Sequence, residues 1–237
     1  REAHVEKPDA IIVGTAFGCL EDTYSFLSKL VQYKEDMLSP TAFIHSTHNT
    51  IASQIALLFQ CHGYNSTYVH RALSFESALT DALLLLEEQS AENVLVGGID
   101  EITDAGFTIM DRMGFYKDTS SLQNDILYSE KSKGAVAGEG AAFFSVSSSK
   151  IPGSMAEIAG VEIMSFTDKA EAVERVRQLL ERHELTNPDV FVSGHNGDHI
   201  NDHVNDFVAT ELHCDGRILK YKHWCGEFAT ATGFGTW

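Results

Sequence analysis

The sequence predicts a layered α/β fold with mixed β-sheets and buried helices. Two observations lead to this class. Short apolar runs that suit buried strands alternate along the chain with segments whose apolar residues recur at helical spacing. In addition, the 237 residues are 43% hydrophobic and 22% charged, which allows a sizeable core in one or two domains.

The first part of the chain contains three expected helices and two expected strands. Residues 10–14 form an apolar strand that leads into a glycine-containing turn, and residues 20–33 have helical spacing. Residues 49–59 predict a buried helix. A second strand lies within 63–72, and residues 73–86 predict a mostly buried helix because they are apolar on more than one face.

The rest of the chain continues the alternation of strands and helices. An amphipathic helix with many charged residues is expected at 169–183. Four further strands are expected at residues 94–98, 141–146, 156–163 and 190–193. The polar stretch 117–133 predicts a long surface excursion rather than a linker.

Composition excludes several classes of partner. A net charge of −17 argues against nucleic acid and anionic membranes, which attract proteins through Lys and Arg patches. No apolar run approaches the roughly 20 residues that span a bilayer, and no N-terminal signal is recognisable, so we expect a cytoplasmic protein. The four cysteines have neither a paired zinc spacing nor a dense disulfide pattern, so we expect reduced thiols.

Residues 63–72, Gly-Tyr-Asn-Ser-Thr-Tyr-Val-His-Arg-Ala, carry the most informative motif. This segment resembles the nucleophile elbow of β-ketoacyl synthases, members of the thiolase-like superfamily, in which a segment G-P-N-x-T-x-x-x-A-C places a reactive Cys between a strand and a helix. Gly63, Asn65 and Thr67 are in register with it, and Ala72 stands at the Cys position. A methyl group cannot attack a thioester.

Other segments resemble the same family in the same order along the chain. They are the glycine turn at 14–18, Ser39-Pro40 with Asn49 and Ala52, Val96-Gly97-Gly98 with Asp100-Glu101, and the G-E-G-A motif at 138–141. The resemblance divides the chain into residues 1–150, an N-terminal ketosynthase-like half, and residues 151–237, a partial C-terminal half. Because family members are longer, the chain is either a compact member or a truncated piece.

The resemblance assigns three more residues to a catalytic site. The segment 192–198 resembles the V-N-A-H-G-T-G-T loop, which places His195 on a catalytic histidine. The segment 222–227 resembles the K-x-x-x-G-H loop, which places Lys222 on the family lysine and Glu227 on the second catalytic histidine. The family's Cys-His-His triad becomes Ala72-His195-Glu227, so both acylation and decarboxylation are compromised.

This implies a member of the acyltransferase family that has kept the fold and lost condensation. The resemblance is nearest to chain-length factors, which pair with an active ketosynthase in fatty acid or polyketide biosynthesis. Residue 72 is not the Gln that those factors often carry, which favours a divergent branch such as the aryl polyene type. Acyl carrier protein or an acyl thioester is the implied ligand, and no cofactor or metal is implied. Because carrier proteins are acidic too, docking them requires a local basic patch or the partner subunit.

A dimer is also implied, with itself or with an active ketosynthase. In this family the two-fold interface is formed by the strand and helix that precede the elbow, which correspond here to residues 50–67. The apolar side chains of this segment suit such an interface, although a monomer core would explain them equally well.

Two other readings of the sequence are open. A helix would place His195, His199 and His203 on one stripe, as in a metal-dependent hydrolase, but the Asn196-Gly197 turn interrupts it. Residual acyl transfer or decarboxylation would need another nucleophile, for which Ser74, Ser77 and Cys225 are the candidates.

Overall fold

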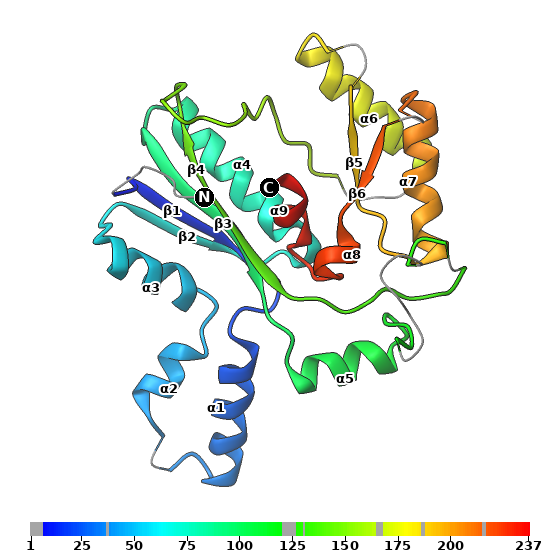
Figure 1. Ribbon diagram of the computed structural model, residues 1–237. Helices are drawn as coiled ribbons and strands as arrows, with labels where there is room; N and C mark the ends of the chain where they lie inside the picture. Colours follow the sequence, from blue (N-terminus) through cyan, green and yellow to red (C-terminus); the bar gives the residue numbers. More distant parts are fainter. Residues whose placement is uncertain are drawn as a thin grey trace.

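The computed structural model describes residues 7–36, 38–119, 127–129, 131–164, 168–185, 188–214 and 217–237. Within these ranges a four-stranded mixed sheet has the strand order β2-β1-β3-β4, and β5 and β6 form a two-stranded parallel sheet (Figure 1). The strands are β1 (Ala10–Gly14), β2 (Tyr64–Tyr68), β3 (Asn93–Asp100), β4 (Gly140–Ser147), β5 (Phe191–Ser193) and β6 (Ile218–Lys220). The predicted α/β class is confirmed.

Helices connect and cover the strands. They are α1 (Leu20–Gln32), α2 (Pro40–His45), α3 (Thr50–Phe59), α4 (Ser74–Glu87), α5 (Asp104–Arg112), α6 (Lys169–Arg182), α7 (His199–Glu211), α8 (Lys222–Cys225) and α9 (Ala231–Thr236). A 3₁₀ turn, η1 (Arg71–Leu73), precedes α4. The part of the chain that the model describes contains no helix with the length and apolarity that a membrane span requires.

Strand β1 forms the centre of the core because both of its faces are covered. Ala10 and Ile12 pack with α4, whereas Ile11 and Val13 pack on the opposite side with residues of α3, and all four are buried. This alternation follows from the two-residue period of a strand. A continuous apolar run therefore forms a strand between two helical layers, as parallel sheets require.

The helix predicted at 49–59 is present as α3, but the prediction that it is buried is wrong. Among its residues only Ala52 is buried, and Leu57 and Leu58 are 71% and 82% exposed. The inner side of α3 packs on β1, while its outer side meets solvent. Among the described residues, strand β2 beside it is the edge of the sheet and pairs only with β1.

The strand predicted at 156–163 is also absent. Residues 155–164 form no helix or strand, although Ile158 and Val161 pack against the core formed by β1, β3 and α4. Alternating apolar residues reproduce the pattern of a strand, but a strand exists only where a neighbour accepts its backbone hydrogen bonds. The excursion predicted at 117–133 lies partly outside the described residues.

The second sheet carries helices α6 and α7 on one side (Figure 1). Val173 of α6 and Ala209 of α7 are buried together with Phe191 and Ile218 of the two strands. Both helices begin at an Asp whose carboxylate accepts a hydrogen bond from the backbone, Asp168 from Ala170 N and Asp198 from Ile200 N. The loop after β5 and helix α8, which follow the two strands of this second sheet, lie beside the first sheet.

Candidate functional site

The elbow predicted around Ala72 exists as a strand, a tight turn and a helix. Strand β2 ends at Tyr68, η1 contains Ala72, and α4 begins at Ser74. Arg71 has a left-handed backbone conformation, with φ of 52°, which makes the turn sharp. Ala72 is exposed and presents only its methyl group.

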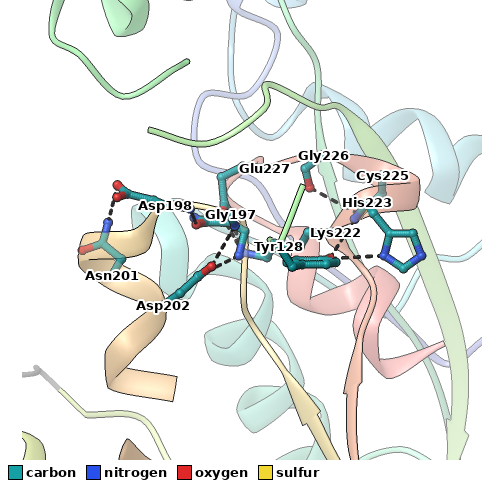
Figure 2. A network of polar contacts seen from close by, with 11 residues as sticks. Tyr128, Gly197, Asp198, Asn201, Asp202, Lys222, His223, Cys225, Gly226 and Glu227 are labelled. Carbon is teal, nitrogen blue, oxygen red and sulfur yellow. Dashed lines mark hydrogen bonds and ion pairs between the residues drawn. The ribbon is translucent and has the colours of Figure 1, made fainter. Parts of the chain in front are cut away.

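A cluster of polar side chains forms around Glu227 in the loop after α8 (Figure 2). Lys222 Nζ donates to both carboxylate oxygens, at 2.7 Å to Oε1 and 2.6 Å to Oε2. Asn196 Nδ2 donates to Oε2 at 2.6 Å. The side chain of Lys222 is 11% exposed and that of Glu227 is 27% exposed. These charge-assisted bonds are short and hold the carboxylate from two segments, helix α8 and the loop after β5.

The backbone holds Glu227 in place independently of its side chain. Glu227 N donates to Val136 O at 2.7 Å, and Gly138 N donates to Glu227 O at 3.0 Å. This pairing brings Gly138 against Gly226 so closely that a Cβ added to Gly138 would lie 2.0 Å from Cys225 O. The first glycine of the G-E-G-A motif therefore serves a close approach of two backbones.

His195, predicted as a catalytic residue, forms its side-chain hydrogen bonds with Ser193 and Asp206 and not with Glu227. Its Nδ1 lies 2.5 Å from Ser193 Oγ and its Nε2 lies 2.9 Å from Asp206 Oδ1 of α7. The residue is only 2% exposed. Both ring nitrogens are engaged inside the second half of the chain, so this geometry joins β5 to α7. The structure brings Lys222 and Glu227 together, but not His195 with them.

Asn196 is the site residue that sequence reasoning did not assign. Its side chain is fixed, because Oδ1 accepts from Asp198 N at 3.0 Å and Nδ2 is thereby directed to Glu227. The backbone N–H groups of Asn196 and Gly197 each donate to the carboxylate of Asp202 at 2.9 Å. Asn-Gly followed by an Asp that begins a helix is a turn signal that could have pointed to this side chain.

Asp100 connects the turn after β1 to the start of α9. Its Oδ1 accepts from Thr15 Oγ1 at 3.1 Å and Ala16 N at 2.8 Å, and its Oδ2 accepts from Thr230 N at 3.2 Å. Asp100 is 5% exposed. It therefore anchors the segment that follows Glu227 to the end of β3.

A second carboxyl group, Glu76 in the first turn of α4, lies on the side of the elbow that faces α9. Burial raises its pKa, while the Thr232 hydroxyl, the backbone and the positive charge of Lys222 oppose that shift. Neither Glu76 Oε2 nor Thr232 Oγ1, both buried, reaches a hydrogen-bond partner in the described chain, so their interaction is weak. Burial also raises the pKa of Tyr221 strongly, with Glu227 and Cys225 adding to the effect.

The three alternative nucleophiles have structural roles. Ser74 Oγ donates to Arg71 O at 2.7 Å and accepts from His70 N, while Ser77 Oγ donates to Leu73 O at 2.7 Å. Burial raises the pKa of the Cys225 thiol, which disfavours the reactive thiolate, although Lys222 opposes this.

The described residues also offer no metal centre. They contain no group of three or more His, Cys, Asp or Glu side chains that could hold a metal ion. His199 and His203 lie on α7, but His195 lies before it, and His199 Nδ1 is 2.9 Å from Ser132 O. The three histidines do not form one stripe.

The cluster can bind and orient, but it has no group placed to attack a thioester. A carboxylate that already accepts three hydrogen bonds cannot donate one to a developing enolate oxygen. The fold and this geometry define a thiolase-like α/β protein whose elbow has no nucleophile. A family model described as "Beta-ketoacyl synthase, N-terminal domain" matches residues 3–121, which is half of the chain. The chain belongs to the β-ketoacyl synthase family.

Solved structures share this fold. "The ishigamide ketosynthase/chain length factor" is 16% identical with a TM-score of 0.76, and 97% of this chain covers 61% of that one. A β-ketoacyl synthase from Burkholderia phymatum STM815 is 14% identical with a TM-score of 0.73, and the match covers 100% of this chain and 62% of that one. The type II polyketide synthase complex AntDE:AntF, a ketosynthase with its acyl-carrier protein, is 15% identical with a TM-score of 0.76. The match covers 100% of this chain and 65% of that one.

The chain spans less than two thirds of the length of each of these three structures. No curated protein matches it in sequence. The similarity to the solved structures therefore concerns the fold.

Proposed function

We propose that the protein is a condensation-inactive, chain-length-factor-like partner of an active ketosynthase. The observation that carries this proposal is the carboxylate of Glu227. It stands at the second histidine position of the family pattern and is hydrogen-bonded to Lys222 and Asn196. An acceptor at this position disfavours an enolate, and Ala72 provides no thiol for the acyl group. Within the proposal, residues 1–150 are the N-terminal half of the ketosynthase-like unit and 151–237 part of its C-terminal half.

The exposed apolar surface of α3 supports an interface with a partner. Leu57 and Leu58 are 71% and 82% exposed, Phe59 is 39% exposed, and Tyr64 on the neighbouring edge strand β2 is 46% exposed. The free edge of β2 also leaves backbone groups for another strand. Both features lie within residues 50–67, the segment that the family resemblance assigns to the two-fold interface.

Acyl carrier protein, or an acyl thioester, is the ligand of the assembly in this proposal. Because the chain carries a net charge of −17 and carrier proteins of this family are acidic, we assign carrier-protein docking to the ketosynthase subunit. Fatty acid or polyketide biosynthesis is the proposed pathway class. Ala72 in place of Gln is the feature that favours the divergent aryl polyene branch.

Co-expression with a competent ketosynthase from the same source tests the proposal. We expect a stable complex that contains this chain and the ketosynthase in equal amounts. Leu58→Glu should abolish the complex, because a charge would be buried in the interface. The matched control is Leu185→Glu, which changes a 51% exposed leucine after α6, away from α3 (Figure 1). Sedimentation of each variant alone checks that the fold is intact and detects a homodimer. A wild-type chain that stays separate from the ketosynthase would overturn the proposal.

A further inference from the structure

The carboxylate of Glu227 is bound in the way that proteins bind a free carboxylate ligand. Two donors from different segments, Lys222 Nζ of α8 and Asn196 Nδ2 of the loop after β5, make three hydrogen bonds of 2.6–2.7 Å to its two oxygens. The pair of oxygens is therefore held by one buried ammonium group and one neutral amide. Charge-assisted bonds of this length are the strong class of hydrogen bond.

The amide donor is oriented by contacts that do not involve Glu227. Asn196 Oδ1 accepts from Asp198 N, and its own backbone N–H is held by Asp202, as is that of Gly197. Gly197 O also accepts from Lys117 Nζ at 2.8 Å. The Asn196 amide would keep its direction if the Glu227 side chain were shortened.

The backbone that carries Lys222 and the main chain at Glu227 are also held independently of the carboxylate. Lys222 O accepts from Gly226 N at 2.8 Å, which closes the turn of α8. The main chain of Glu227 is paired on both sides with residues 136–138. Truncating the Glu227 side chain should therefore remove the bound carboxylate and leave the Asn196 amide and the backbone of Lys222 in place, so that acetate has to order only the Lys222 side chain.

We propose that Lys222 and Asn196 form a binding site for small carboxylate anions, which Glu227 occupies from within the same chain. While Glu227 is in place, no external carboxylate reaches the ammonium group, including the free carboxylate of a dicarboxylic acyl thioester. The inference deepens the proposed function and rests on it in one respect, that the site no longer serves condensation. It explains how Lys222, whose side chain is only 11% exposed, stays paired without a bound ligand.

Two other ionisable groups act on this site. Glu76 feels the charge of Lys222, but burial raises its pKa and favours its neutral form, which makes it a weak competitor for the ammonium. The Cys225 thiol also faces Lys222, and burial raises its pKa as well. Acetate should therefore find the Lys222 charge available when the Glu227 carboxylate is absent.

Glu227→Ala in sodium acetate tests this inference. The substitution removes Cγ, the carboxyl carbon and both oxygens, which are the heavy atoms that acetate supplies. We expect 100 mM acetate to raise the Tm of the variant by about 5 °C over sodium chloride of equal ionic strength. The wild-type protein should show no difference between the salts, because its site is filled.

Glu162→Ala is the control, because Glu162 also pairs with cations, Arg182 at 2.6 Å and Arg175 at 3.5 Å, but the side chains of these two arginines are 58% and 43% exposed and stay hydrated without a carboxylate. Its Tm should not respond to acetate. Lys222→Met combined with Glu227→Ala should also abolish the response. If Glu227→Ala is insoluble in chloride, its refolding yield in acetate replaces the Tm as the readout. The site is refuted if Glu227→Ala has the same Tm, or the same refolding yield, in acetate and in chloride. It is also refuted if acetate raises the Tm of the wild-type protein by the same amount.

The acetate response and the proposed function can fail separately. Acetate binding reports only on the Lys222 and Asn196 donors and needs no ketosynthase. Complex formation reports only on the surface of α3 and β2. A protein that pairs with a ketosynthase but ignores acetate in the Glu227→Ala variant would leave the proposed function standing and remove the carboxylate site.

Discussion

Asn196 and Glu227, 31 residues apart in sequence, are joined by a hydrogen bond of 2.6 Å between Nδ2 and Oε2. This bond identifies Asn196 as the residue of its loop that faces the second histidine position of the family pattern. His195, one residue earlier, is turned to Ser193 and Asp206. Two imidazoles would thus face each other here if histidines stood at residues 196 and 227.

The first prediction restores a thiol and its activating groups. Ala72→Cys with Asn196→His and Glu227→His should load an acyl group from a reactive acyl thioester on the order of a hundredfold faster than Ala72→Cys alone, because an imidazole beside the thiol, where the family resemblance places it, promotes the thiolate. Intact mass spectrometry measures the adduct, and peptide mapping should place it on residue 72.

The same series decides which loop residue matters. Ala72→Cys with Glu227→His alone has an imidazole at residue 227 but none at residue 196 and should recover loading only in part. If this double variant is as fast as the triple variant, a histidine at residue 196 adds nothing and the direction of the Asn196 side chain does not govern the chemistry. A thiol reagent that labels the single variant Ala72→Cys shows that residue 72 is accessible.

Sequence patterns predicted the elements whose apolar residues are periodic. The strands β1, β3, β4 and β5 and the helices α1, α4 and α6 were expected within a few residues of their observed bounds. All but α1 lie in or against one of the two sheets, whereas α1 has no buried residue and packs on α2 through Phe26 and Phe43. The strand at 156–163 failed because its pattern arises from packing against the core without any strand as neighbour.

The candidate site was less predictable because it depends on side-chain direction across distant loops. The motif at 222–227 assigned Lys222 and Glu227 to two family positions, and the turn of α8 between them brings the two side chains together. The loop at 192–198 gave no information on which of two adjacent side chains faces that pair. The directions of the two side chains depend on Asp202, which binds the Asn196 backbone, and Asp206, which binds the His195 ring. Both aspartates belong to α7, and only the folded chain brings them into contact with the loop.

The second prediction concerns the ion pair between Lys222 and Glu227. Lys222→Met should lower the free energy of unfolding by about 3 kcal/mol, because it leaves a partly buried carboxylate without its main partner. Adding Glu227→Gln should recover most of that loss, since no charge then needs compensation. Urea unfolding of the two variants and the wild-type protein measures this. A double variant less stable than Lys222→Met would contradict it.

The third prediction concerns Asp100, whose carboxylate accepts from both the β1 turn and Thr230. Asp100→Ala should lower the free energy of unfolding by about 3 kcal/mol, or Tm by roughly 6–12 °C, because buried donors lose a charged acceptor. Asp189→Ala is the control, since that carboxylate is 95% exposed and paired with Arg217 on the surface. Its Tm should stay within experimental error of the wild-type value. Equal losses in both variants would remove the anchoring role of Asp100.

The fourth prediction concerns pH and Glu76. Burial raises the pKa of Glu76 in the folded protein above its value in the unfolded chain, so between the two pKa values the folded state binds more protons. The stability contributed by the neutral carboxyl is fully present below the unfolded pKa and is lost as pH rises through the folded pKa. Glu76→Gln keeps the shape but cannot ionise. Its stability advantage over the wild-type protein should therefore be small near pH 4.5 and increase with rising pH.

Urea midpoints of the two proteins at intervals between pH 4.5 and pH 8 measure this difference, and all other carboxyl groups cancel in the comparison. Glu88→Gln, which changes an exposed glutamate at the C-terminal end of the same helix, provides the control for the substitution itself. A Glu76→Gln advantage that shrinks as pH rises would mean that Lys222 stabilises the ionised carboxylate more than burial penalises it. The charge of Lys222 would then be shared between two carboxylates, and acetate would compete with Glu76 in the Glu227→Ala variant.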